Sequence, residues 1–452
     1  MSSSRPAPLS GFPEFLPAQR VVELHVIDTL RAIFELHGFA SIETRATETL
    51  DQLLRKGEID NEVYVLRRLH AAEDDARDAH LGLHYDLTVP FARYVLENAG
   101  RLEFPLRRYQ IQKVWRGERP QEGRYREFTQ ADIDVVARDV LPFHHDVEIA
   151  RVMASALAAL TFLPPLRLQV NNRKLIEGFY RGVGAPDPGA VMRVVDKLDK
   201  VPADVVAKML ADDAGLSGEQ VRQCIALAEI RTAGTDFVER VRALDVSNEL
   251  LDDGLAELEA VIGGCADLAT DRFVVEADLR IARGLDYYTG TVFETRMAGY
   301  ESIGSICSGG RYDSLATDGR VTYPGTGISL GISRMLVPLL ARGRLTGSRS
   351  VPSAVLVALP DDESRARCDE IAQALRARGI ATEVSPNAQK YGRQIRFAER
   401  RGIPYVWFPG AAGEPDEVKD IRSGAQVVAD PADWMPPADD LRPHVVIEGE
   451  SS

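Results

Sequence analysis

The 452-residue chain lacks most of the features that would assign it to a class at once. Its four cysteines, Cys224, Cys265, Cys307 and Cys368, lie far apart and form no C-x-x-C pair, which argues against a disulfide framework or a structural zinc site. No apolar run reaches the roughly 18 residues that a transmembrane helix needs. The N-terminus has no charged segment followed by an apolar one, so we do not expect a secretory signal. A reducing, cytoplasmic compartment is the simplest expectation.

Positive charge is also scarce. The chain has 54 Lys+Arg against 68 Asp+Glu, a net charge of −14. This excludes a protein coated with positive charge, because broad binding to nucleic acid requires a dense basic surface. A nucleic-acid partner is therefore restricted to local basic sites. The 45% hydrophobic and 27% charged residues are typical of globular proteins, and the length predicts roughly two or three domains.

Common cofactor motifs are missing as well. No P-loop pattern G-x-x-x-x-G-K-S/T occurs. The pattern Gly325-x-Gly327-x-x-x-Gly331 differs by one residue from a dinucleotide fingerprint, and no βαβ unit with a downstream acidic residue follows it. The pair His144-His145 has no partner at metal-ligand spacing, so we interpret it as a solvated loop pair.

The hydrophobic pattern divides the first part of the chain into three kinds of segment. Residues 21–37 have helical spacing. Residues 105–136 read as a long antiparallel hairpin around a charged turn at 116–126. Residues 170–268 are rich in helical periodicity, and we interpret them as a helical insertion. Strand-like segments return after it.

The last part of the chain has a different pattern. Residues 342–350 form a polar linker, the best domain boundary. Beyond it, strands alternate with helices, which predicts a small α/β domain with a largely parallel sheet. The last twenty or so residues are rich in proline and acidic residues, and we expect them to be frayed.

Five segments carry side chains suited to anionic or polar ligands. In residues 107–126 seven basic residues interleave with aromatics, and a solvated hairpin with ion pairs is the alternative interpretation. Arg116 follows an apolar strand, so we expect its guanidinium to point into a pocket. In ARGLDYYTG, Arg283 either pairs with Asp286 in a core or helps to form a polar pocket. The other segments are Asp86-Leu87-Thr88, Ser308–Asp313 (SGGRYD) and Arg334.

Together and in this order, the motifs resemble the histidyl-tRNA synthetase family of class II aminoacyl-tRNA synthetases. RGLDYYTG and SGGRYD resemble its two histidine-specific signatures, FTQADID the end of its motif 2, and LHYDLTVPFARY its eukaryote-like substrate loop. The resemblance runs from about Gly11 to about Gln426. It implies an α+β protein: a class II synthetase antiparallel-sheet catalytic core with a helical insertion, plus a C-terminal α/β anticodon-binding domain. The expected limits are 1–169 and 269–341 for the core, 170–268 for the insertion and 351–435 for the last domain.

The resemblance implies that the protein activates L-histidine with ATP and transfers it to the 3′ end of tRNA(His). Arg116 would bind the α-phosphate and the histidine carboxylate, and Arg334 the γ-phosphate of a bent ATP. Arg283 would stabilise charge on the α-phosphate as the histidine carboxylate attacks. Guanidiniums suit these roles because they remain protonated where two anions must meet.

The histidine-binding residues follow from the same resemblance. An imidazole needs both a donor and an acceptor, which a phenol and a carboxylate supply. A site that hydrogen-bonds a polar side chain discriminates well, so no editing activity is needed. Asp86, Thr88 and Gln130 would hold the α-ammonium, and Asp134 and Tyr288 the imidazole, with Tyr287 adjacent.

The implied partners are tRNA(His), L-histidine, ATP with Mg²⁺ and a second copy of the chain in a homodimer, without a membrane or a structural metal. Arg119, Gln121, Arg124 and Arg126 would contact the tRNA acceptor end. The anticodon would meet a basic helix that carries Lys390, Arg393, Arg396, Arg400 and Arg401.

Two positions depart from the family pattern. Thr44 is followed by Arg45 where motif 1 usually has proline, and Ser333 stands where motif 3 usually has glutamate before its arginine. Two alternatives remain beside the enzyme. One is a non-catalytic relative, either a synthetase-like regulatory subunit of histidine biosynthesis or a sensor module. The other is an α/β enzyme that uses a different carboxylate substrate.

Overall fold

The computed structural model describes residues 6–54, 62–70, 80–199, 201–281, 287–411 and 413–448. The chain forms two compact units. The first unit comprises residues 1–13 and 27–338, and the second comprises 14–26 and 339–452. Within the described ranges, no helix has both the length and the apolar character needed to cross a membrane.

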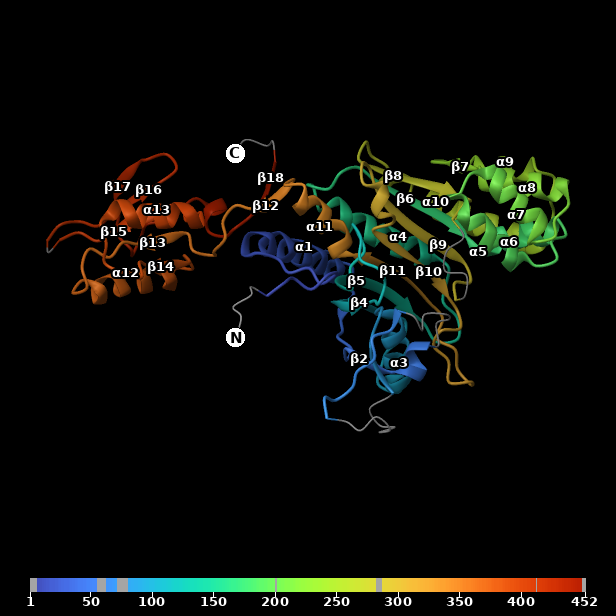
Figure 1. The fold of residues 1–452 in the computed structure, drawn as a ribbon, viewed down its shortest axis with the longest axis horizontal. Helices are drawn as coiled ribbons and strands as arrows, with labels where there is room; N and C mark the ends of the chain where they lie inside the picture. The colour runs from blue at the N-terminus through green and yellow to red at the C-terminus, as the bar shows by residue number, and fades with distance from the viewer. Residues whose placement is uncertain are drawn as a thin grey trace. The chain divides into compact units, whose positions relative to one another are not determined.

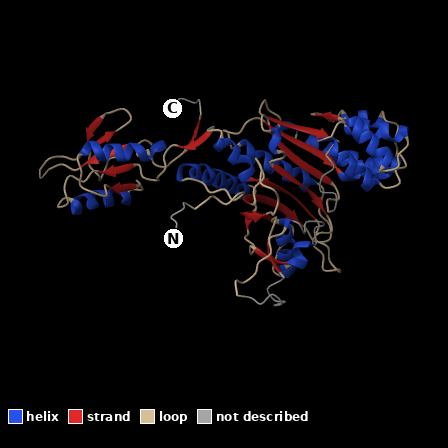
Figure 2. Ribbon diagram, in the orientation of Figure 1, coloured by secondary structure: helices blue, strands red, loops and turns tan. Residues whose placement is uncertain are grey.

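Unit 1 is organised around one large sheet, in which the described residues form nine strands (Figures 1 and 2). All neighbouring strands pair antiparallel except β1 with β4 and β6 with β8. The order across the sheet is β1 (Ala40–Ser41), β4 (Leu106–Trp115), β5 (Glu127–Val136), β11 (Gly325–Gly331), β10 (Cys307–Tyr312), β9 (Thr291–Met297), β6 (Leu166–Asn172), β8 (Phe273–Asp278) and β7 (Arg231–Thr232).

The register of the ladder separates a polar face from an apolar face. Residues that pair directly across strands point to the same side, and the side alternates along each strand. One apolar row joins Ile133, Ile328, Gly309, Phe293 and Val170. The neighbouring row, on the opposite face, is polar throughout: Gln110, Asp132, Ser329, Ser308, Glu294, Gln169 and Glu276.

Helices α4 (His144–Ala158) and α10 (Glu249–Gly264) pack against strands of this sheet. Helix α10 also crosses α5 (Arg173–Gly182) at very short range. A Cβ on Gly254 would lie 2.1 Å from the Leu175 nitrogen, and one on Gly178 would lie 2.2 Å from the Leu251 nitrogen. Glycine at both positions therefore permits the close crossing of the two helices.

Four of the helices between β6 and β8 begin at side-chain caps. Asn172, Asp187, Ser217 and Asn248 each accept a hydrogen bond from a backbone N–H in the first turn of the helix that follows. Figure 1 shows these helices grouped beside the β6–β8 side of the sheet. Those not yet named are α6 (Pro188–Val195), α7 (Ala203–Asp212), α8 (Gly218–Ala228) and α9 (Phe237–Arg242).

The N-terminal part of the chain supplies helix α1 (Pro17–Leu36) and a small hairpin of β2 (Thr47–Thr49) with β3 (Leu81–Leu83). Short helix α2 (Leu50–Leu53) follows β2, and α3 (Thr88–Asn98) follows β3. Helix α11 (Ile332–Ala341) continues directly from β11.

Unit 2 contains a five-stranded sheet in the order β14, β13, β15, β16, β17, in which the first three strands are parallel. Helix α12 (Arg365–Ala377) packs on one face of β13 and β15, and α13 (Tyr391–Arg401) on the other. This agrees with the α/β pattern predicted beyond residue 350. The strands are β13 (Val355–Val357), β14 (Thr382–Val384), β15 (Tyr405–Phe408), β16 (Glu417–Asp420) and β17 (Gln426–Val428).

Two expectations from the sequence were wrong. The C-terminal segment is anchored rather than frayed up to residue 448: β18 (Val445–Ile447) pairs with β12 (Leu345–Gly347), and Asp440 accepts bonds from Tyr405 and Arg422. The histidine pair lies at the start of α4 instead of in a solvated loop. His145 is buried, with Nδ1 2.8 Å from Glu148 Oε2. In the first case, pairing with residues about 100 positions away decided the structure.

Candidate active site

A cavity on the polar face of the sheet in unit 1 contains Arg116, the residue after β4. Arg116 Nε donates to the carbonyl oxygen of Tyr85 at 3.0 Å, and its guanidinium carbon lies 5.1 Å from the centre of the Phe128 ring. A carbonyl oxygen orients a guanidinium without neutralising its charge, so the cavity is suited to an anionic ligand. The lining residues are Arg116, Glu118, Gly123, Tyr125, Phe128, Gln130, Ser305, Ile306, Ser308, Ser329, Gly331 and Arg334.

The second arginine of this cavity, Arg334, is in the first turn of α11. It donates from Nε to the Gly123 carbonyl at 2.7 Å and from Nη1 to the Ser305 carbonyl at 3.0 Å. The neighbouring Ser333 is buried, and its Oγ accepts the Thr129 amide at 2.9 Å. A hydroxyl at the position where the family pattern has glutamate thus ties the start of α11 to β5.

A smaller pocket on the same face surrounds the carboxylate of Asp134. Tyr312 donates to Asp134 Oδ1 at 2.8 Å, and Arg108 Nη2 lies 2.6 Å from Oδ2. Burial raises the pKa of Tyr312, so this phenol stays protonated and remains a donor. A Cβ on Gly327 would lie only 2.1 Å from Asp134 Oδ1, which explains the glycine facing it on β11.

Tyr287 and Tyr288 line the same pocket as Asp134 and Thr88. The two tyrosine rings lie 4.1 Å apart between centroids. Burial raises the pKa of Tyr287, so its hydroxyl is retained at neutral pH. The pocket therefore offers phenols and a carboxylate, the groups that hydrogen-bond both nitrogens of an imidazole.

Two further carboxylates lie beside this pocket. Asp86 is buried, and its Oδ1 accepts the Val89 amide at 3.0 Å at the start of α3. Gln130 donates to Asp132 Oδ1 at 3.1 Å, and burial raises the pKa of Asp132, which the nearby charge of Asp86 raises further. The structure thus brings Asp86, Gln130 and Asp132 together.

Arg108 and Asp132 did not appear among the candidate residues from the sequence. Arg108 is fully buried, next to Asp134 and 4.2 Å from the centre of the Phe91 ring. A signal for Asp132 was available. It lies two residues from both Gln130 and Asp134 on one strand, so all three side chains share a face.

Other predicted residues lie farther from these pockets or outside the described residues. Arg119, Gln121 and Arg124 are exposed in the turn between β4 and β5. Arg126 donates to the Glu118 carbonyl at 3.3 Å and so helps to hold that turn. Arg283 is outside the described residues. No cluster of three or more His, Cys, Asp or Glu side chains suited to a metal ion occurs in the ranges that the structure describes.

Arg311, the arginine of SGGRYD, is held by contacts within the protein. Arg311 Nη1 lies 2.8 Å from Asp146 Oδ2, and Nη2 donates to the Leu141 carbonyl at 2.6 Å. Burial raises the pKa of Asp146 to about 6, although the charge of Arg311 opposes that shift. This pair fixes β10 against α4.

A separate basic cavity of about 400 Å³ lies in unit 2 against α13. Arg393, Arg396 and Arg400 line it together with Phe397. Arg401 is placed differently, because it forms an ion pair with Glu383. The positions 393, 396 and 400 share one face of the helix, which concentrates positive charge there.

Comparisons with known proteins give matches that together cover almost the whole chain. The family model described as Histidyl-tRNA synthetase matches residues 11–335, and one described as Anticodon binding domain matches residues 353–425. A protein of Cutibacterium acnes named Histidine--tRNA ligase is 58% identical, covering 98% of this chain and 99% of its own. One of the same name from Thermobifida fusca is 52% identical and covers 95% and 98%.

Solved structures show the same likeness. The histidyl-tRNA synthetase of Nostoc sp. PCC 7120 has a TM-score of 0.82 and 34% identity, covering 95% of this chain and 97% of that one. A Bacillus halodurans protein, described as an ATP phosphoribosyltransferase regulatory subunit/histidyl-tRNA synthetase, has a TM-score of 0.72 at 21% identity, which shows the fold alone. From the matched family models and the full-length relatives together, the chain belongs to the histidyl-tRNA synthetase family.

Proposed function

We propose that this chain is a histidine–tRNA ligase that works in two steps. A carboxylate oxygen of histidine attacks the α-phosphorus of ATP and pyrophosphate leaves, which gives histidyl-adenylate. The histidyl group then moves to the 3′ end of tRNA(His). The relatives named Histidine--tRNA ligase support this over nearly the full chain. The carrying observation is that a cavity with two carbonyl-held arginines and a pocket with a carboxylate and phenols share one sheet face.

The residue roles follow the chemistry of each pocket. Arg116 would bind the α-phosphate and the histidine carboxylate, since its charge is available in the cavity. Arg334 would bind the γ-phosphate of an ATP that arrives with Mg²⁺ as its counter-ion. Arg283 is proposed, from the motif alone, to stabilise charge at the α-phosphate.

The histidine itself would occupy the smaller pocket. Asp134 and Tyr288, with Tyr287 adjacent, would hydrogen-bond the imidazole. Asp86, Thr88 and Gln130 would hold the α-ammonium. The burial of Asp86 and Asp134 supports this assignment, because a buried carboxylate binds a cationic group with little competition from water.

The tRNA would be held at two basic places. Exposed Arg119, Gln121 and Arg124, with Arg126 at the base of their turn, would meet the acceptor end. The anticodon would meet the unit 2 cavity lined by Arg393, Arg396 and Arg400, with Lys390 and Arg401 nearby. We further propose that the enzyme acts as a homodimer in the cytoplasm.

The test is histidine-dependent exchange of pyrophosphate into ATP, followed by charging of tRNA(His). Exchange with histidine and Mg²⁺–ATP, but not with other amino acids, is the expected result. Histidine binding without exchange would instead favour a non-catalytic relative, and exchange driven by another amino acid would contradict the assigned pocket.

Arg283→Ala tests the role assigned to that residue. It should lower the adenylation rate constant far more than histidine affinity, because its charge would act on the transition state. A large loss of histidine binding with an unchanged rate constant would contradict the role.

A further inference from the structure

The SGGRYD motif lies directly against Tyr288 of the pocket proposed for histidine. The row of the sheet that carries Asp134 continues through Gly327 of β11 to Gly310 of β10. A Cβ on Gly310 would lie 2.5 Å from the Thr291 carbonyl oxygen and 3.0 Å from Tyr288 Cδ1. Glycine at this position therefore leaves the room that the Tyr288 ring occupies beside β10, in the pocket that Asp134 also lines.

The residue after Tyr288 is bound by the same motif through both its backbone and its side chain. The Thr289 amide donates to the Arg311 carbonyl oxygen at 2.9 Å. The Thr289 Oγ1 donates to Asp313 Oδ2 at 2.5 Å. Because Tyr288 and Thr289 are consecutive, these two bonds fix the backbone from which the Tyr288 phenol extends.

Asp313 is itself placed by Arg311. The Arg311 Nε lies 3.3 Å from Asp313 Oδ1, while its Nη1 lies 2.8 Å from Asp146 Oδ2 on α4. Asp313 thus connects Thr289 to the ion pair that fixes β10 against α4. The Asp313 side chain is 43% exposed, so water can take its place when it is removed, and Arg311 then retains its buried partner Asp146.

The contacts of Asp313 lie outside the pocket. Neither Thr289 nor Asp313 is among the described residues that line it, whereas Tyr288 is. The bond between Thr289 and Asp313 has an ionised acceptor, which makes it stronger than a hydrogen bond between neutral groups. An effect of Asp313 on histidine binding would therefore be transmitted through the position of Tyr288.

We propose that Asp313 is a positioning residue for histidine recognition: through its hydrogen bond with Thr289, it holds the Tyr288 phenol where the imidazole binds. The inference rests on the proposed function and adds a residue that sets the affinity for histidine without touching it. The imidazole takes no part in bond making or breaking, so its contacts stabilise the ground state and the transition state equally. A displaced Tyr288 therefore raises the KM for histidine and leaves kcat unchanged.

The test is pyrophosphate exchange by the full-length protein, with histidine and ATP varied separately. Asp313→Ala and Thr289→Val should each raise the KM for histidine about tenfold, the scale of one hydrogen bond to a charged group. The kcat and the KM for ATP should stay at their wild-type values. The double variant should show no further rise, because both changes remove the same bond. Thr289→Ser keeps the hydroxyl and should have nearly the wild-type KM for histidine.

Thr317→Val is the matched control, because Thr317 is exposed and its Oγ1 donates to the Val321 carbonyl oxygen at 3.1 Å within a turn. The unfolding free energy of each variant is measured as well, since a purely structural role would lower stability and change kcat and both KM values together. An unchanged KM for histidine in Asp313→Ala, or the same rise in Thr289→Ser as in Thr289→Val, would overturn the proposal.

Failure of the proposed function would have a different result, the absence of histidine-dependent exchange in the wild-type protein. Calorimetric titration of histidine into the same variants then decides the positioning role. Weaker binding in Asp313→Ala and Thr289→Val, with wild-type binding in Thr289→Ser, would support it. Equal binding in all of them would contradict it.

Discussion

Two groups of arginine in unit 1 are anchored in different ways. In the cavity with Arg116 and Arg334, the guanidiniums bond to backbone carbonyl oxygens. Arg108, beside the Asp134 pocket, and Arg311, on the face of β10 that meets α4, are anchored instead by the carboxylates of Asp134 and Asp146. A carbonyl leaves the positive charge available to a ligand, whereas a carboxylate compensates it. Arg116 therefore suits catalysis, and the carboxylate-anchored arginines suit structure.

The largest expected effect concerns the carboxylate-anchored group. Arg108→Met should lower the free energy of unfolding by about 3–5 kcal/mol, because it leaves the buried carboxylates of Asp132 and Asp134 without their cation. Denaturant unfolding measures this. Lys113→Met on the same strand is the control, since its pair with Glu127 is exposed and should contribute about 1 kcal/mol or less. Equal losses of unfolding free energy in Arg108→Met and Lys113→Met would contradict the structural role of the buried, carboxylate-anchored arginine.

The carbonyl-anchored group should behave in the opposite way. Arg116→Ala should reduce histidine-dependent exchange by about 10²–10³-fold, the effect of removing one donor that stabilises transition-state charge. Its unfolding free energy should fall by only about 1 kcal/mol, the contribution of one hydrogen bond. Arg138→Ala, which removes an arginine whose side chain is 62% exposed, serves as the control for exchange. If Arg116→Ala unfolded the protein, Arg116 would act in structure, as the carboxylate-anchored arginines do.

A pH dependence follows from the pair of Arg311 and Asp146. Burial raises the pKa of Asp146 to about 6 from a usual value of 3.8, so the folded protein binds this proton more tightly than the unfolded chain. Its stabilising contribution is complete below about pH 4 and is lost as the pH rises through about 6. Asp146→Asn stays neutral, so relative to wild type it should gain up to ~3 kcal/mol between pH 4 and pH 7.

Unfolding of both proteins across that pH range measures this difference. The control is Asp139→Asn, which changes an aspartate whose side chain is 64% exposed. If the difference in unfolding free energy between wild type and Asp146→Asn did not change with pH, Arg311 would be keeping this carboxylate charged across the whole range.

The smallest expected effect is on the KM for histidine and concerns Asp132. Asp132→Asn should raise the KM for histidine about tenfold with little change in kcat, because its carboxylate adds to the attraction that Asp86 exerts on the α-ammonium in both ground and transition states. Exchange kinetics at varied histidine give both constants. An unchanged KM would mean that Asp132 is already protonated and acts as a structural group.

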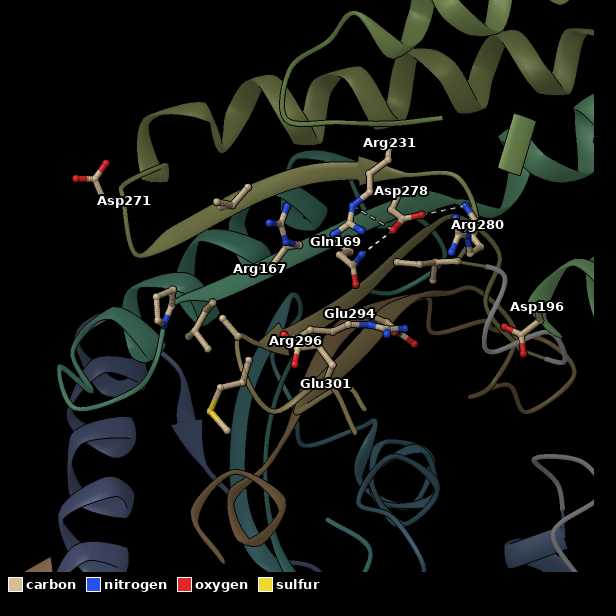
Figure 3. Close-up of a pocket in the computed structure, with 16 residues that line it drawn as sticks. Arg167, Gln169, Asp196, Arg231, Asp271, Asp278, Arg280, Glu294, Arg296 and Glu301 are labelled. Carbon is tan, nitrogen blue, oxygen red and sulfur yellow. Dashed lines mark hydrogen bonds and ion pairs between the residues drawn. The ribbon is translucent and has the colours of Figure 1, made fainter. Parts of the chain in front are cut away.

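The sequence predicted the fold class, the hairpin of motif 2 and the α/β pattern of unit 2, because these depend on local periodicity. Arg116 was correctly expected in a pocket, since it follows an apolar strand. The burial of Arg108 was not expected, because a basic residue in a charged run appears solvated until its ion partner on β5 is known. The anchoring of the C-terminal segment also depends on residues about 100 positions away. The cavity of about 430 Å³ over β6, β8 and β9 (Figure 3) likewise depends on three strands meeting in register.

That register has a consequence for insertions and deletions. Glu294 belongs to the polar row of the sheet, while its neighbour Phe293 belongs to the apolar row on the other face. Lengthening or shortening β9 by one residue would exchange their faces, placing a carboxylate in the core and a phenyl ring on the polar face. Related chains should therefore keep the length of β9, even where its residues differ.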